Sequence, residues 1–171
     1  MNDNTTAPLD GLPDSPPVDP AVRARQHWLS VLAHAPAATL TDLADKLMTG
    51  TPVDTLRAPE TGLVMVRARM ANQGDRFNLG EATMTRCVLR HTGGSGTVSV
   101  GVGYVLGRDA GRARLVALAD ALLQQPEWHQ RLHDQLITPL AHATAARRAR
   151  QQQDTARSRV QFFTLQPEAA A

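Results

Sequence analysis

The spacing of hydrophobic residues changes twice along the chain, and each spacing predicts a different kind of element. Between residues 18 and 50, apolar side chains recur at helical intervals, which predicts two helices. The first helix begins after Asp19, whose carboxylate can cap it, and it ends at about Ala35. The second begins with the hydroxyl of Thr39 as its cap and ends before Gly50.

The pattern then switches to an alternation of period two, which predicts an antiparallel β-meander of about four strands. The expected strands are residues 53–57, 63–70, 77–90 and 97–106. Gly80 interrupts the third strand and predicts a β-bulge. One face of the second strand consists of apolar side chains, namely Val64, Val66, Ala68 and Met70. We expect this face to point into the core.

In the last strand, small residues make one face smooth. Gly101 and Gly103 lie two positions apart, so they share a face and would let another backbone approach closely. Asp109 follows this strand and can cap a helix that runs to about Gln125. A long helix then begins near Glu127, and Pro139 should bend it.

The two ends of the chain differ in composition from its centre. Residues 1–17 have almost nothing to bury, so we expect a disordered leader there. Residues 147–159 contain five arginines and no large apolar residue, and Phe162 and Phe163 follow them. These features predict a single α+β domain over residues 18–146, with two N-terminal and two C-terminal helices, and a basic arm and docking tail over residues 147–171.

Composition narrows the classes of function. A chain of 171 residues with 42% hydrophobic content can bury one sizeable core. It has a single cysteine, no apolar signal segment near its start and no apolar run approaching the roughly 20 residues of a membrane span, so we expect a cytoplasmic protein. The formal net charge of +2 neither implies nor excludes nucleic acid.

The stretch from Pro59 to Cys87 carries more polar side chains than strand alternation requires. They are Arg67, Arg69, Asn78, Glu81 and Arg86, and Arg108 lies farther along the chain, ahead of a helix. Guanidinium groups form paired hydrogen bonds with carboxylates or phosphates, so these residues are candidates for contact with a partner or an anion. The simpler interpretation is the solvated face of a sheet.

Catalytic arrangements are weaker alternatives. His129 and His133 have helical i, i+4 spacing but lack the Glu of an HExxH motif, so a solvated helix face is the simpler interpretation. Cys87 lies in the middle of a strand, where a small apolar side chain fits, and the histidine that a nucleophilic cysteine needs would have to come from elsewhere in space. Glu60 and Glu81 would be an acid/base pair if they met in space, but salt bridges with Arg67, Arg69 or Arg86 explain them better.

A nucleic-acid-binding function is the alternative from a different class. Two helices, a β-meander and an arginine-rich helix are compatible with a winged-helix-like DNA-binding regulator. A recognition helix needs a polar or basic outer face. The second helix instead presents Thr41, Asp42, Asp45 and Lys46, which make that face net acidic.

Several segments of the chain resemble the PhnG family, the G subunits of the bacterial carbon-phosphorus lyase system. These segments are RQHWLSVLA (Arg25 to Ala33), LRAPETGLVMVRARM (Leu56 to Met70), RFNLGEATMTRCVL (Arg76 to Leu89), GVGYVLGRD (Gly101 to Asp109) and FFTL (Phe162 to Leu165). The FNLGE and TRC motifs within them are specific, and the resemblance spans about residues 22 to 165.

The resemblance implies an accessory subunit that acts with the H, I, J and L proteins of organic phosphonate catabolism, chiefly with I. Their complex transfers the ribose triphosphate of ATP to methylphosphonate and releases adenine. By this resemblance the chemistry belongs to other subunits, so we expect no catalytic residue, metal or cofactor on this chain alone, with ATP a substrate of the complex. The arginine-bearing strands, Phe162 and Phe163 would then contact partners.

Overall fold

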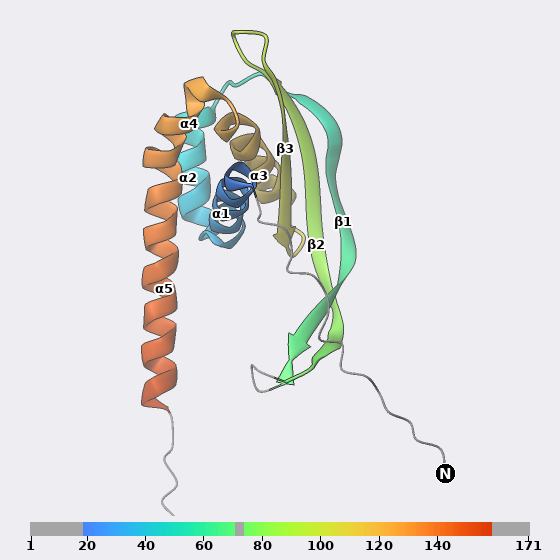
Figure 1. Ribbon diagram of the computed structural model, residues 1–171, viewed down its shortest axis with the longest axis vertical. Helices are drawn as coiled ribbons and strands as arrows, with labels where there is room; N and C mark the ends of the chain where they lie inside the picture. Colours follow the sequence, from blue (N-terminus) through green and yellow to red (C-terminus); the bar gives the residue numbers. More distant parts are fainter. Residues whose placement is uncertain (1–18, 71–73, 159–171) are drawn as a thin grey trace, which may run out of the picture.

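The computed structural model describes residues 19–70 and 74–158. Its sheet has three antiparallel strands in the order β1 (Asp54–Arg69), β2 (Arg76–Thr92) and β3 (Val98–Leu106). The helices all lie on one side of this sheet, so the sheet has a helix-covered face and an outer face (Figure 1). The α+β class predicted from the sequence is confirmed.

Two helices precede the sheet, namely α1 (Pro20–His34) and α2 (Ala37–Met48). After the sheet come α3 (Ala110–Leu123), α4 (Pro126–Leu132), the π-helical segment η2 (His133–Ile137) and α5 (Thr138–Arg157). No described helix is long and apolar enough to cross a membrane.

The predicted helix caps are confirmed at two of three positions. Asp19 accepts a hydrogen bond from the Ala21 N–H at 2.8 Å, and Asp109 accepts one from the Arg112 N–H at 2.9 Å. The cap predicted at Thr39 is wrong, because α2 begins two residues earlier and has no side-chain cap. Pro36 takes the N-cap position with a φ of −59°, a value that proline fixes and that suits the start of a helix.

The helix-covered face of β3 is the smooth face predicted from its glycines. A Cβ atom on Gly101 would lie 2.8 Å from the Cβ of Ala121, and the backbone of α3 would be closer still. The absence of side chains at Gly101 and Gly103 therefore lets α3 pack directly against the backbone of this strand. Buried side chains from the helical layer complete the core, including Leu32, Leu40, Leu122, Leu132, Leu136 and Leu140.

The predicted number of strands is one too many. The sequence predicts separate strands over residues 53–57 and 63–70, whereas β1 is continuous from Asp54 to Arg69. Pro59 interrupts the alternation in the sequence, but β1 is an edge strand, where proline is tolerated. Register shifts on both sides of Arg57 accommodate the irregular segment without ending the strand.

The predicted core face of β1 is also wrong. Val64, Val66 and Ala68 are only half-buried, and Met70 is exposed. On β2, the buried side chains are Thr85, Cys87, Leu89 and His91, which alternate along the helix-covered face. Thr61 is the cross-strand partner of Thr85, so Thr61, Leu63 and Met65 continue that face, and Val64 and Val66 lie on the outer face.

Pro139 lies in the first turn of α5, two residues after the end of the π-helical segment. Proline has no N–H to donate, so it removes one hydrogen bond from a regular helix. In the wider π turn, the N–H of Thr138 reaches back to the carbonyl of His133. The helix predicted to bend at Pro139 thus contains a π-helical turn shortly before this residue.

Candidate interaction surface

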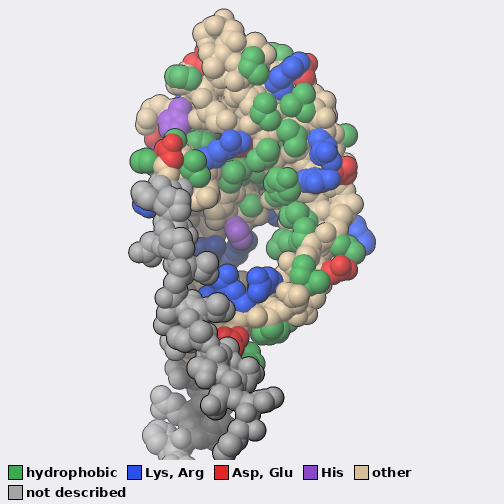
Figure 2. Space-filling view, turned by 45° about the vertical axis from the view of Figure 1, so that its right-hand side comes forward, with side chains coloured by type: hydrophobic (Ala, Val, Ile, Leu, Met, Phe, Trp, Pro, Cys, Tyr) green, Lys and Arg blue, Asp and Glu red, His purple; other side chains and the backbone are tan. Residues whose placement is uncertain are grey.

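The outer face of the sheet is not covered by any of the described helices (Figure 1). Side chains of β3 on this face are large, apolar and exposed, namely Val98, Val100, Tyr104 and Leu106. Across the strand pair, Leu106 lies opposite Met84 of β2, and Tyr104 and Val100 lie opposite Arg86 and Arg90. Figure 2 shows hydrophobic side chains gathered along the strands with basic side chains among them. An apolar sheet face of this kind is typical of an interaction surface.

Charged side chains on the outer face are already paired within the chain. Glu60 binds both Arg57, at 2.6 Å, and Arg86. These hydrogen bonds, first from Arg57 and then from Arg86, hold the pKa of the Glu60 carboxyl below its ordinary value. Asp54 pairs with Arg90 at 2.8 Å. The outer face therefore offers apolar contact with its charges largely neutralised in place.

Beyond the end of β3, the sheet narrows to two strands. Leu106 pairs with Met84, and the Gly107 N–H donates to the Thr83 carbonyl, so beyond Thr83 the residues 76–82 of β2 pair with β1 alone. We call residues 63–69 and 76–83 the hairpin arm. No side chain in it is buried, and it extends past the helices α1 and α3 (Figure 1). The register shift opposite Gly80, whose φ is +151°, confirms the predicted bulge within this arm.

The structure divides the polar residues predicted from the sequence between two faces. Arg67 is the cross-strand partner of Asn78, and Met65 is the partner of Glu81. Alternation along β1 therefore puts Arg67, Arg69, Asn78 and Glu81 together on one face of the hairpin arm, continuous with the helix-covered face. Arg86 lies on the outer face instead, beside Glu60.

The remaining predicted contact residues lie elsewhere. Arg108 is exposed in the turn between β3 and α3, one residue after Gly107, whose N–H donates to the Thr83 carbonyl at the base of the hairpin arm. Phe162 and Phe163 lie outside the described residues. The basic segment predicted from residue 147 continues α5 as an exposed helix to Arg157.

The free edge of β3 is occupied by side chains from the helices, a feature that the sequence analysis missed. The carbonyl of Val100 accepts hydrogen bonds from Arg25 at 3.1 Å and Gln124 at 2.9 Å. The Val102 N–H donates to Asp120 at 2.9 Å. Because these groups would otherwise pair with another strand, a partner is directed to the sheet face and not to this edge.

Asp120 is fully buried and organises this edge. Its carboxylate accepts hydrogen bonds from the indole N–H of Trp28 at 2.9 Å and from Arg25 at 2.7 and 3.1 Å. The Val102 N–H also donates to this carboxylate, so the buried charge of Asp120 is fully hydrogen-bonded. A sequence signal did exist, since Asp120 is a lone acid in the apolar run LVALADALL of α3.

The catalytic alternatives do not assemble. Glu60 lies on the outer face and Glu81 on the opposite one, so they are not an acid/base pair. Cys87 is fully buried, and burial raises the pKa of its thiol, which disfavours the reactive thiolate. Among the residues that the structure describes, no group of three or more His, Cys, Asp or Glu side chains could hold a metal ion.

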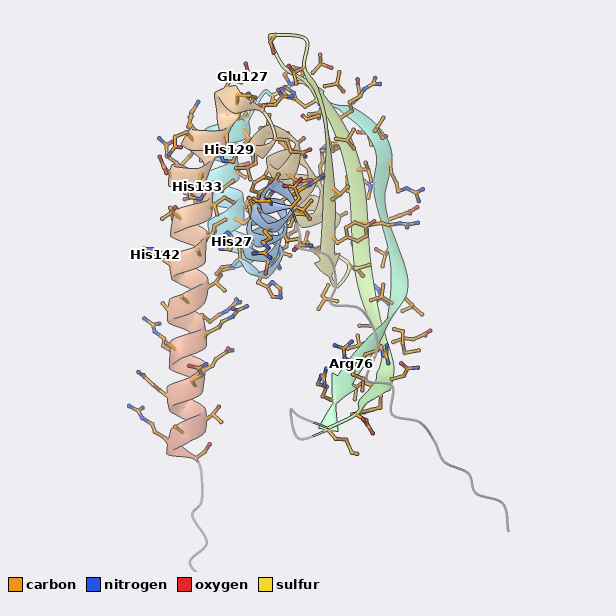
Figure 3. The ribbon with its side chains drawn as sticks, viewed as in Figure 1. His27, Arg76, Glu127, His129, His133 and His142 are labelled. Atoms are coloured by element: carbon orange, nitrogen blue, oxygen red, sulfur yellow. The ribbon has the colours of Figure 1, made fainter. Side chains whose placement is uncertain are left out.

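His27, His129, His133 and His142 lie in the helical layer (Figure 3), whereas His91 lies on β2. His129 contacts the edge of the Trp28 ring, and its Nδ1 lies 2.7 Å from the carbonyl oxygen of Leu123. The ring of His133 stacks on that of His129, with centroids 6.3 Å apart. His129 is thus part of the packing between α1 and α4.

The sequence was compared with known proteins. The profile of a family described as "Phosphonate metabolism protein PhnG" matches residues 23–166. The chain belongs to the PhnG family. Within this family, it is 40% identical over 147 residues to the protein from Rhizobium meliloti (strain 1021) named alpha-D-ribose 1-methylphosphonate 5-triphosphate synthase subunit PhnG. That alignment covers 86% of this chain and 91% of the relative.

Membership of the PhnG family confirms the resemblance found in the strand motifs. The matched region includes all the described strands and both surfaces defined above, the outer face and the hairpin arm. The relative is named as a subunit, and therefore as part of a larger assembly. The comparisons give no support to the winged-helix-like alternative.

Proposed function

We propose that this chain is an accessory subunit of the carbon-phosphorus lyase system in the cytoplasm. It supports the transfer of the ribose triphosphate of ATP to methylphosphonate, with release of adenine. Its partners are the H, I and J subunits and the L protein, chiefly the I subunit. ATP is a substrate of the complex, and the chain by itself binds no cofactor or metal and supplies no catalytic residue.

The uncovered apolar sheet face is the observation that carries this proposal. Val98 and Leu106 are 57% and 67% exposed, and they lie in one row with Val100 and Tyr104. Burying such a row in an interface removes apolar area from water, which stabilises a complex. The paired state of Arg86 and Arg90 balances most of the charge on this face within the chain.

Co-purification tests the proposal directly. We expect the tagged chain, co-expressed with the H, I, J and L proteins, to retain the I subunit through purification. The I subunit should release adenine from ATP and methylphosphonate faster when this chain is present, as measured by chromatography of the bases. Failure of the wild-type chain to retain any of these proteins would refute the proposal.

A matched pair of valine substitutions identifies the surface used. Val100→Asp introduces a charge into the outer face, whereas Val22→Asp introduces the same charge at an exposed valine of α1. We expect Val100→Asp to lose the I subunit and Val22→Asp to retain it. Circular dichroism of both variants should show that each remains folded.

A further inference from the structure

The hairpin arm is a two-stranded ribbon that projects from the body of the protein. From Leu63 to Arg69 it spans about 20 Å at the usual rise of a strand. No described residue adds a third strand to it, since β3 ends opposite Met84. Two strands alone are marginally stable in water unless something packs against them. The arm therefore has the geometry of an element that a partner covers.

One face of the arm tip is cationic. Arg69 on β1 and Arg76 on β2 are direct cross-strand partners, and Arg67 lies on the same face, opposite Asn78. Like charges directly opposite each other destabilise a strand pair. None of these three arginines forms an ion pair with an acid among the described residues, in contrast to Arg57, Arg86 and Arg90. A bound acid would relieve the repulsion.

Nearer the body, the β1 half of this face is apolar, and Glu81 and Thr83 lie opposite it on β2. Leu63 and Met65 precede Arg67 at alternate positions of β1, and they are 65% and 54% exposed. A small anion such as a nucleoside triphosphate could pair with the arginines, but it would leave these two side chains in water. A protein surface with carboxylates beside apolar side chains complements both halves of the face.

We propose that the hairpin arm inserts into a partner subunit and that Arg67, Arg69 and Arg76 bind carboxylates of that subunit. This inference rests on the proposed function and specifies the chemistry of the partner. The partner's acidic segment lies along the side of the arm that continues the helix-covered face. Figure 2 shows the molecule hollowed between the sheet and the helices on this side, with Lys and Arg side chains at the rim, and Figure 3 labels Arg76 on the arm.

Charge reversal of the arm tests this inference in the full chain. The triple variant Arg67→Glu, Arg69→Glu, Arg76→Glu is compared with a control triple variant of equal charge change, Arg23→Glu, Arg131→Glu, Arg150→Glu, at exposed positions on α1, α4 and α5. Affinity for the co-purified partner subunits is measured across a range of salt concentrations. We expect the arm variant to bind at least about tenfold more weakly, with a flatter salt dependence, and the control to stay within about twofold.

A single substitution separates binding from folding. Arg69→Glu converts the repulsive pair with Arg76 into an attractive one, so we expect it to raise the melting temperature of the free chain. The same substitution removes a carboxylate contact and should weaken the complex. A higher melting temperature together with weaker binding cannot result from a merely damaged fold, which would lower both.

Three outcomes would overturn the inference while leaving the proposed function intact. In the first, the arm variant binds the partner subunits as tightly as the wild-type chain does. In the second, the free wild-type chain binds ATP and the arm variant does not. In the third, the free wild-type chain self-associates and the arm variant does not. If the wild-type chain retains no partner subunit, the proposed function fails as well, and the two failures are thereby distinguished.

Discussion

Gly101 permits the closest approach between the sheet and the helical layer, so Gly101→Ala is a quantitative test of the fold. The new Cβ would lie 2.5 Å from the backbone nitrogen of Ala121 and closer still to the carbonyl oxygen of Ala117, where ordinary van der Waals contact begins at 3.4 Å. The helix α3 must therefore retreat by more than about 0.9 Å from the strand. Its backbone is the obstacle and cannot turn aside as a flexible side chain would.

The expected cost follows from this geometry. Overpacking against a rigid neighbour costs up to about 3 kcal/mol, and replacing a strand glycine by alanine returns about 0.5–1 kcal/mol of backbone entropy. A net loss of about 2 kcal/mol corresponds to a melting temperature lower by about 4–8 °C for a chain of this size. Retreat of α3 also strains the bond from the Val102 N–H to Asp120.

Gly62→Ala is the matched control in the same sheet. A Cβ atom on Gly62 would meet nothing within 4 Å, so we expect an unchanged or slightly raised melting temperature. Both variants are compared by differential scanning calorimetry. A melting temperature of Gly101→Ala within about 1 °C of wild type would refute the reasoning, because the helix could then not be in contact with the strand.

Three further predictions concern single side chains. Asp120→Asn removes the charge that binds Arg25, and we expect the free energy of unfolding in urea to fall by about 2–3 kcal/mol, since Arg25 is partly exposed. As a control, Asp154→Asn removes an exposed ion pair and should change the free energy of unfolding by less than about 0.5 kcal/mol. Equal losses in the two variants would contradict the argument that burial makes the Asp120 pair important. Cys87 should react slowly with a thiol reagent in the native protein and fully in denaturant, because burial raises its pKa, and rapid native labelling would contradict this. Glu60→Gln should melt below wild type near neutral pH. The pKa of Glu60 is lowered in the folded protein, so its ionised carboxylate stabilises the fold at pH values above the ordinary pKa of 4.5. This difference should shrink as the pH falls through the lowered pKa, and a difference that grows in acid would contradict it.

The sequence predicted correctly those features that are determined by a residue and its near neighbours along the chain. The caps at Asp19 and Asp109, the bulge at Gly80 and the smooth face at Gly101 each follow from the chemistry of a single position. Pro59 was misleading, because whether a proline ends a strand depends on whether that strand is at an edge, and no local pattern states this.

The faces of β1 could not be assigned from alternation. Leu63 and Met65 are as apolar as Val64 and Val66, and the arm lacks the cover that would make one set buried and the other polar. The candidate site depends on the same ambiguity. The bulge at Gly80 makes Asn78, and not Leu79, the partner of Arg67, and a shift of one residue would transfer each side chain to the other face. Register is therefore what groups Arg67, Arg69 and Arg76 and separates them from Arg86.

The π turn before Pro139 has a consequence for how the sequence can change length. A turn closed from His133 to Thr138 holds one residue more than an α-helical turn, so deleting a residue there would rotate all of α5 by about 100°. Leu140 and Thr144 would leave the core, and Arg147 would lose the carbonyl of His34 that it binds at 2.8 Å. The chain should therefore tolerate substitutions in this turn far better than the loss of one residue from it.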